Sequence, residues 1–267
     1  MIGRIRGIFA RSICGCCLMM IAVAMVVPSQ GGAWGQTVFL VTGNEYAPFT
    51  DETLPEGGLF TKIVRMIYDR NGEAVEFAFR PWKRGYLETL EGRFEATFPY
   101  ILTDERAEAF YFSAPVLFVL VQLYTKSDSD FFADEYNDLT GRQTCLPNGY
   151  ANTTRIERLV EQGRLKRVTA TSMASCLRRL AQGRVDFVEL NNFVAPTVIR
   201  ETGLVPGVFR VLELTTDKVG HYVLYPKSGP DAGNKRDRFD AALEEVRKTG
   251  ELDRLIETYL QGLNPNS

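Results

Sequence analysis

Trp82 and Arg106 are the side chains of this sequence best suited to holding a small molecule. They lie near the two ends of the segment RPWKRGYLETLEGRFEATFPYILTDER, residues 80–106, which has the pattern of a strand end, a helix and a second strand. The planar guanidinium of an arginine binds a carboxylate through two parallel, charge-assisted hydrogen bonds. An indole at a strand end offers flat apolar area with few rotamers to freeze. Each residue also has a structural alternative: Arg106 in a weak surface ion pair with Glu105 or Glu108, and Trp82 covering the core.

Other reactive side chains are scarce. The chain has one histidine, His221, and lacks the HExxH, GxxxxGK[ST], GxGxxG and GxSxG motifs. His221 precedes the β-rich segment YVLY and is interpreted as a junction residue rather than a catalyst. We therefore expect no metal and no cofactor.

The elements that must position these residues alternate between strand and helix. Hydrophobic periodicity predicts strands at 37–43, 74–81 and 95–100 with helices between them, and a short helical turn from Thr103. The same order returns at residues 143–203, which predicts a second α/β unit with a mostly parallel sheet. Two extended apolar segments, near 113–124 and 209–225, are predicted to pass between the two units, and two amphipathic helices end the chain.

The first 35 residues have the composition of a secretory signal. Arg4, Arg6 and Arg11 precede an apolar run at 13–27, and a polar stretch ends in small residues. The run is shorter than the roughly 20 residues of a membrane-spanning helix, so we favour export and cleavage over an anchor. Cleavage would remove three arginines and change the formal charge from −2 to −5, which argues against nucleic acid or an anionic membrane as a partner.

Cys145 and Cys176 are the two cysteines that remain after residue 35. An exported protein meets an oxidising compartment, and both residues lie in segments with a predicted buried face. A single disulfide is the favoured interpretation, worth about 3 kcal/mol in the chain-entropy model. The alternative is two buried free thiols.

Four segments in order resemble the bacterial extracellular solute-binding proteins of the polar-amino-acid type, family 3. They are EYAPFTD, LEGRFEATFPYILTDERAEAFYFSAP, LAQGRVDFVELNN and ALEEVRKTGELDRLIETYL, and the likeness covers residues 37–262. The resemblance implies a two-lobed periplasmic-binding-protein fold of type II, in which each lobe is a mostly parallel sheet flanked by helices and two strands join the lobes. It further implies a monomer that closes over a small solute and delivers it to an ABC-type membrane permease.

The resemblance assigns roles to residues that match the family's motifs. Arg106, in the segment Thr103-Asp104-Glu105-Arg106, matches the arginine that grips the ligand carboxylate. Tyr46 of EYAPF and Trp82 match aromatic residues that lie against the ligand. In open α/β sheets, ligands sit beyond the carboxyl ends of the strands, where these residues are expected.

The sequence also departs from the family pattern. The segment FPYIL stands where the family has a serine or threonine that helps to hold the ligand carboxylate. Only Tyr100 and a backbone amide are left to assist in this role. Asn191 replaces the aspartate that pairs with a ligand ammonium, and Glu189, on the same strand face, either supplies the missing charge or faces the hinge. In GYANTT, Tyr150 could line the second lobe's wall, and Asn152 either does so too or caps the following helix.

We therefore expect residues 36–120 with 222–267 to form lobe one and residues 121–221 to form lobe two. The predicted function is periplasmic binding of a small solute that carries a carboxylate, an amino acid or a related organic acid, rather than catalysis. The alternatives are a dehydratase-like enzyme on the same fold, with Glu189 as its acid or base, and a sensory or accessory binding protein without an importer.

Overall fold

Strands and helices alternate along the first half of the chain, as the sequence pattern predicts. The computed structural model describes residues 37–205, 207–214 and 217–263, so the predicted signal segment 1–35 lies outside the described residues. The first elements are β1 (Val38–Thr42), η1 (Pro55–Gly57), α1 (Leu59–Arg70), β2 (Val75–Phe79), α2 (Trp82–Leu90), β3 (Ala96–Tyr100), α3 (Asp104–Ala109), β4 (Phe110–Phe112) and β5 (Leu117–Lys126).

The second half repeats the alternation and ends in two helices. Its elements are η2 (Tyr136–Leu139), β6 (Gln143–Pro147), α4 (Thr154–Glu161), β7 (Lys166–Ala170), α5 (Met173–Ala181), β8 (Val188–Asn191), α6 (Val194–Glu201), β9 (Phe209–Val211), β10 (Asp217–Pro226), α7 (Ala232–Lys248) and α8 (Glu251–Leu263). Lobe one is used below for β1–β4, α1–α3, α7 and α8, and lobe two for β6–β8 and α4–α6. The sequence boundaries of the lobes, at 120/121 and 221/222, stay a prediction.

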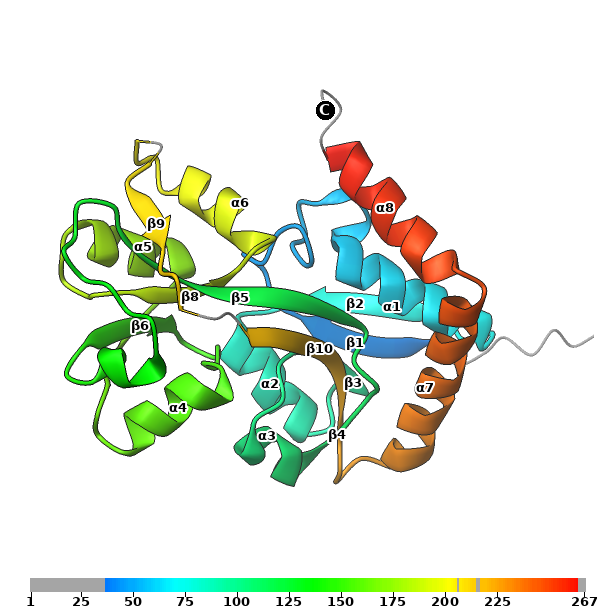
Figure 1. The fold of residues 1–267 in the computed structure, drawn as a ribbon. Helices are drawn as coiled ribbons and strands as arrows, with labels where there is room; N and C mark the ends of the chain where they lie inside the picture. The colour runs from blue at the N-terminus through cyan, green and yellow to red at the C-terminus, as the bar shows by residue number, and fades with distance from the viewer. Residues whose placement is uncertain (1–36, 206, 215–216, 264–267) are drawn as a thin grey trace, which may run out of the picture. The chain divides into compact units, whose positions relative to one another are not determined.

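One long sheet runs through both lobes. Its strand order is β2-β1-β3-β10-β5-β8, with β4 paired to β10 and β9 paired to β5. β1 is parallel to β2 and β3, whereas β10 is antiparallel to β3, β4 and β5. Strands β5 and β10 lie along the middle of Figure 1, as predicted for the two segments that pass between the lobes.

Lobe two contains both parallel and antiparallel strand pairs. β6 and β7 form a separate parallel pair, whereas β8 pairs antiparallel with β5. A single parallel bridge, between Thr144 and Phe187, links β6 to the segment that enters β8. The long β5 supplies the antiparallel partner, because it continues past the lobe junction and offers β8 an edge.

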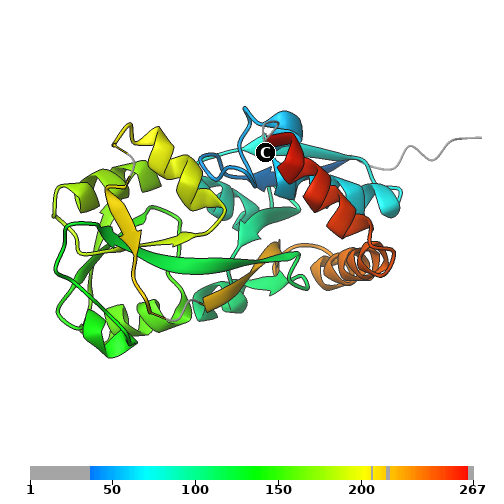
Figure 2. The same cartoon turned by 45° about the horizontal axis from the view of Figure 1, so that its top comes forward.

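The core of lobe one forms where the predicted helical stripe meets the sheet. Phe60, Ile63, Val64 and Ile67 of α1 are fully buried, at the i, i+3, i+4 and i+7 spacing of one helix face. Helices α7 and α8 pack against α1, so the end of the chain returns to lobe one (Figures 1 and 2).

The predicted disulfide between Cys145 and Cys176 is confirmed. It joins β6 to α5, with both residues fully buried and their Cα atoms 5.4 Å apart. The alternative of two free thiols is therefore wrong. The bridge ties the sheet of lobe two to the helix that covers it.

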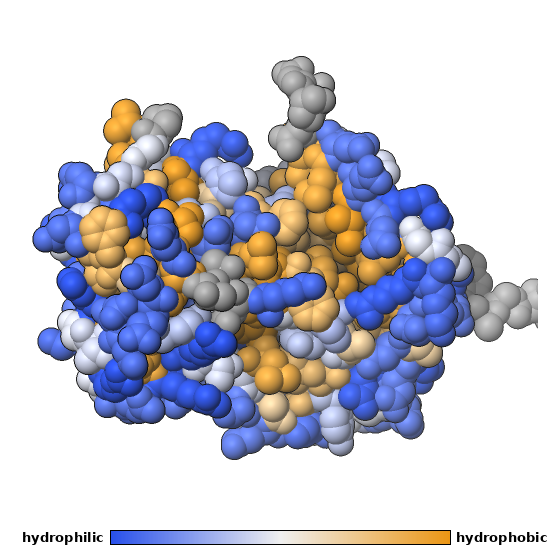
Figure 3. Space-filling view, viewed as in Figure 1, coloured by the Kyte–Doolittle hydropathy of each residue, from blue (hydrophilic) through white to orange (hydrophobic). Residues whose placement is uncertain are grey.

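Polar side chains cover most of the surface. On the face shown in Figure 3, hydrophilic residues dominate the outer sides of both lobes, and hydrophobic residues gather along the middle. Phe118 and Leu120 of β5 are exposed apolar residues at the lobe junction. None of the helices in the described part of the chain has the length and apolar character that crossing a membrane requires.

Candidate ligand-binding site

Arg106 lies just beyond the carboxyl end of β3, inside the first turn of α3. Thr103 caps this helix by accepting a hydrogen bond from the Arg106 backbone N–H at 3.2 Å, which fixes where the side chain starts. The side chain is 8% exposed and its guanidinium carbon lies 4.7 Å from the centre of the Tyr100 ring. No ion pair joins Arg106 to Glu105 or Glu108 in the described structure, which removes the surface-pair alternative.

The Arg106 guanidinium also reaches across to lobe two. Its Nη1 donates to the carbonyl of Ile101 at 3.0 Å and its Nη2 to the carbonyl of Gly149 at 3.1 Å. Its remaining N–H groups have no hydrogen-bond partner among the described residues. Burial lowers the pKa of Arg106 from its usual value, but an arginine stays protonated in a protein. The site therefore contains a fixed positive charge whose guanidinium still has N–H groups available for a ligand.

A cavity of about 70 Å³ lies beside this guanidinium. Four aromatic rings form most of its wall and meet largely edge to face, with centroid separations of 5.6 to 6.1 Å. The principal lining side chains come from both lobes and the junction strand β10: Tyr46, Trp82, Tyr100, Arg106, Tyr150 and His221.

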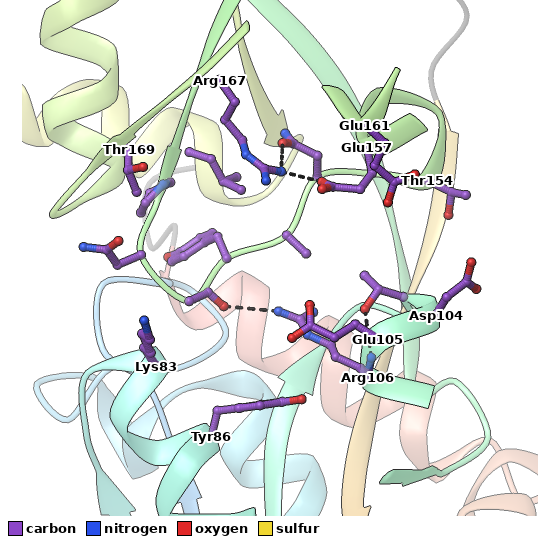
Figure 4. A pocket seen from close by; sticks show the side chains of 18 of the residues that line it. Lys83, Tyr86, Asp104, Glu105, Arg106, Thr154, Glu157, Glu161, Arg167 and Thr169 are labelled. Atoms are coloured by element: carbon purple, nitrogen blue, oxygen red, sulfur yellow. Dashed lines mark hydrogen bonds and ion pairs between the residues drawn. The ribbon is translucent and has the colours of Figure 1, made fainter. Parts of the chain in front are cut away.

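A wider cavity of about 470 Å³ opens on the other side of Arg106. Figure 4 shows Lys83, Tyr86 and Arg106 on the lobe-one side and Arg167, Glu157 and Thr169 on the lobe-two side. Both acidic and basic side chains line it, and Arg167 pairs with Glu157 at 2.5 Å. This wider space, called the outer cavity below, shares Arg106, Gly149, Tyr150 and Ala151 with the smaller inner cavity.

A hydrogen-bonded chain behind the inner cavity connects three parts of the fold. Asn191 Nδ2 donates to the Tyr46 hydroxyl at 2.8 Å, and that hydroxyl lies 2.6 Å from His221 Nε2. Asn191 Oδ1 accepts from the backbone N–H groups of Phe193 and Val194, so the orientation of the amide is fixed. The Tyr46 hydroxyl and His221 Nε2 share one hydrogen bond, whose direction is set by the histidine tautomer.

Glu189 lines neither cavity and is bound to residues of lobe two. Its carboxylate accepts hydrogen bonds from Asn152 Nδ2, from the Thr153 backbone N–H at 3.2 Å and from the Thr153 hydroxyl at 2.6 Å. Asn152 does not cap helix α4, whose N-cap is Thr153. The alternative of a helix cap is wrong, because the Asn152 amide is bound to the Glu189 carboxylate.

Gly149 lets the lobe-two loop approach lobe one closely. Its φ is +86°, and a Cβ atom there would lie 2.6 Å from the Lys83 backbone nitrogen and 2.8 Å from Trp82 Cβ. Backbone atoms at the start of α2 cannot yield, so only glycine fits. Its carbonyl is the one that accepts from Arg106.

Comparison with known proteins identifies the fold. Residues 38–262 match the bacterial extracellular solute-binding proteins, family 3. The chain belongs to this family.

The similar proteins include one curated relative and many solved structures. A probable amino-acid-binding protein of Bacillus subtilis, YxeM, is 29% identical over 160 residues, 59% of this chain and 58% of that protein, so the match spans just over half of the relative's length. A histidine kinase sensor domain similar to periplasmic binding proteins superimposes with a TM-score of 0.71 at 22% identity, over 85% of this chain and 96% of that one. An amino acid ABC transporter substrate-binding protein of Streptococcus pneumoniae, bound to L-arginine, gives 0.66 at 20%, over 84% and 94%.

These likenesses confirm the predicted two-lobed periplasmic-binding-protein fold. In this solute-binding protein, five of the seven predicted ligand-binding residues line the inner cavity: Tyr46, Trp82, Tyr100, Arg106 and Tyr150. Asn191 and Glu189 do not line either cavity. The role of all seven in binding stays a prediction.

Sequence reasoning did not select the other residues that line the inner cavity, of which His221 and Gly149 make the most specific contacts. His221 was expected at a lobe junction, and it does lie on β10 opposite Leu117 of β5. It also lines the inner cavity, where burial lowers its pKa to about 4. His221 and its partner Tyr46 are 175 residues apart in the sequence, so no local motif predicts their contact.

Proposed function

We propose that this protein is a periplasmic receptor that binds a small carboxylate-bearing solute between its lobes and delivers it to an ABC-type importer. The observation that carries the proposal is the buried guanidinium of Arg106, which faces both cavities and keeps N–H groups without a partner. A carboxylate is the group that best satisfies a planar, charged donor of this kind. Aromatic rings beside it supply apolar area for the rest of the solute.

Closure of the lobes over the solute is supported by contacts that join residues of the two lobes. Arg106 reaches Gly149, and Tyr46 reaches Asn191, so residues of the inner cavity in lobe one are coupled to lobe two. A solute that touches both walls would favour the closed arrangement, because only there are both sets of contacts made. Small-angle scattering with and without solute should show a smaller radius of gyration when solute is bound.

Binding is tested by thermal unfolding of the mature protein with a panel of amino acids and organic acids. A solute at 100 times its dissociation constant should stabilise the native state by about 2.7 kcal/mol. At least one carboxylate should raise the unfolding temperature, and the same compound as its primary amide should not. A panel in which no carboxylate raises that temperature would overturn the proposal.

Delivery to an importer is separable from binding. Cells that lack the gene should lose uptake of the stabilising solute and regain it with the native gene but not with a binding-defective variant. Unchanged uptake would favour the sensory or accessory role instead. The dehydratase alternative gains no support from the geometry, because the Glu189 carboxylate is bound to Asn152 and Thr153 and lines neither cavity.

A further inference from the structure

The inner cavity is unbalanced in charge. Among the described side chains that line it, Arg106 is the one that carries a charge, and no carboxylate is present. His221 adds none at neutral pH, because burial holds its pKa near 4. A cationic group placed in this cavity would therefore meet a positive charge and no negative one.

The two side chains that could have balanced a ligand cation are committed elsewhere. Asn191 uses Oδ1 to accept from two backbone N–H groups at the start of α6 and Nδ2 to donate to Tyr46. The Glu189 carboxylate is held by Asn152 and Thr153. Freeing either side chain would leave buried donors or acceptors without partners, which is unfavourable.

The polar groups of the four aromatic side chains also take part in hydrogen bonds within the protein. Each hydroxyl or indole N–H of the four rings already has a partner, so the rings present carbon to the cavity. The Tyr46 hydroxyl accepts from Asn191 and is hydrogen-bonded to His221. Trp82 donates to the Asn44 carbonyl, Tyr100 to the Trp82 carbonyl, and Tyr150 to the Glu45 carbonyl at 3.5 Å. The body of a solute here is best apolar.

The negative charge of Glu45 contributes to raising the pKa of the Tyr150 hydroxyl, but the Glu45 side chain is exposed. Water screens an exposed carboxylate, so it compensates little for a cation buried behind the rings. An ammonium ion that loses water without a paired anion is strongly disfavoured. An ionised carboxylate, in contrast, would gain an ion pair with the Arg106 guanidinium.

We propose that the solute is a small monocarboxylic acid with an apolar body and no α-ammonium group. This inference rests on the proposed function and narrows it. A cavity of about 70 Å³ has room for about five to seven water-sized groups, which fits a short or branched aliphatic acid. The carboxylate would lie at Arg106, with the hydrocarbon among the rings.

The test compares 3-methylbutanoate with small compounds that differ from it in charge or in one substituent, each titrated calorimetrically at pH 7 into the native protein. 3-Methylbutanoate is compared with valine, which adds an α-ammonium, and with 2,3-dimethylbutanoate, which has a methyl group in place of that ammonium. 3-Methylbutanamide lacks the charge of the carboxylate, and glycine betaine probes whether the aromatic wall accepts a quaternary cation.

We expect 3-methylbutanoate and 2,3-dimethylbutanoate to bind at least tenfold more tightly than valine, and neither the amide nor glycine betaine to bind measurably. Valine binding as tightly as its deaminated counterpart, or measurable binding of glycine betaine, would overturn the inference and leave the proposed function standing. Binding of no carboxylate in this set or in the wider panel would remove both. A Glu45→Gln variant should bind 3-methylbutanoate with unchanged affinity, and a tenfold or greater loss would also contradict the inference.

Discussion

Replacing His221 with glutamine should remove a specific part of the protein's sensitivity to acid. The imidazole is 2% exposed, its Nε2 is hydrogen-bonded to the Tyr46 hydroxyl, and its Nδ1 has no hydrogen-bond partner of normal geometry in the described structure. Burial is the main reason that its pKa falls from 6.5 to about 4; the Arg106 charge adds to the shift and the Val219 backbone opposes it. Glutamine keeps an acceptor for Tyr46 and does not titrate.

The sign and size of the effect follow from proton linkage. Between pH 6.5 and about 4 the unfolded chain binds a proton at His221 and the native state does not, so the free energy of unfolding falls as pH falls through this window. At 1.36 kcal/mol for each pH unit below 6.5, the loss is about 2 kcal/mol at pH 5. Above pH 6.5 the contribution is fully present. Tyr46 and Arg106, the titratable groups nearest the imidazole, keep their charge states across the window.

The assay is urea unfolding of the native protein and the His221→Gln variant at pH 7.5 and pH 5.0, without a histidine tag. His221 is the one histidine in the sequence, so the difference between the two proteins isolates this residue, and carboxylates contribute equally to both. The native protein should lose about 2 kcal/mol more than the variant on acidification. Equal losses would refute the assignment of a buried neutral imidazole.

Three further sets of substitutions test the structural roles assigned above. Glu189→Ala should lower the free energy of unfolding by about 3 kcal/mol, because it leaves buried donors unpaired, and Glu189→Gln should lower it less; urea unfolding of both variants decides, and equal losses would contradict this reasoning. Gly149→Ala should weaken solute binding at least tenfold in calorimetry by holding the lobes apart, whereas Gly163→Ala, which has a similar positive φ but no neighbour within 4 Å of its added Cβ, should bind like the native protein. Replacing Cys145 and Cys176 together with alanine should cost about 3 to 4 kcal/mol in urea unfolding, since the bridge spans 31 residues, and a loss below 1 kcal/mol would contradict the chain-entropy reasoning.

The sequence predicts the elements of this fold well because each depends on a local pattern. The stripe of Phe60, Ile63, Val64 and Ile67 identifies α1 and its buried face, and all four are fully buried. The pairing of β8 with β5 could not be read in the same way. It depends on how far the junction strand extends, which no periodicity within residues 185–191 encodes.

The residues of the site likewise differ in whether a local pattern predicts their position. Arg106 and Trp82 follow strand ends that the pattern locates, so their convergence could be predicted. Asn191 and Glu189 share a strand face as alternation requires, yet both are hydrogen-bonded to residues outside that strand and line neither cavity. His221 and Gly149 act through contacts between distant segments, which a single sequence does not reveal.

The central claim is that the Arg106 guanidinium holds the carboxylate of the solute. The most direct measurement is the dissociation constant of the most stabilising carboxylate for the native protein, Arg106→Lys and a matched control, Arg65→Lys. Arg65 also donates to one backbone carbonyl and lies 4.8 Å from an aromatic ring centre, but it lines neither cavity. Circular dichroism should show that all three proteins are folded. The account predicts a loss of affinity of about tenfold or more for Arg106→Lys and none for Arg65→Lys, because lysine cannot reproduce the two parallel bonds. Native affinity in a folded Arg106→Lys variant would contradict it.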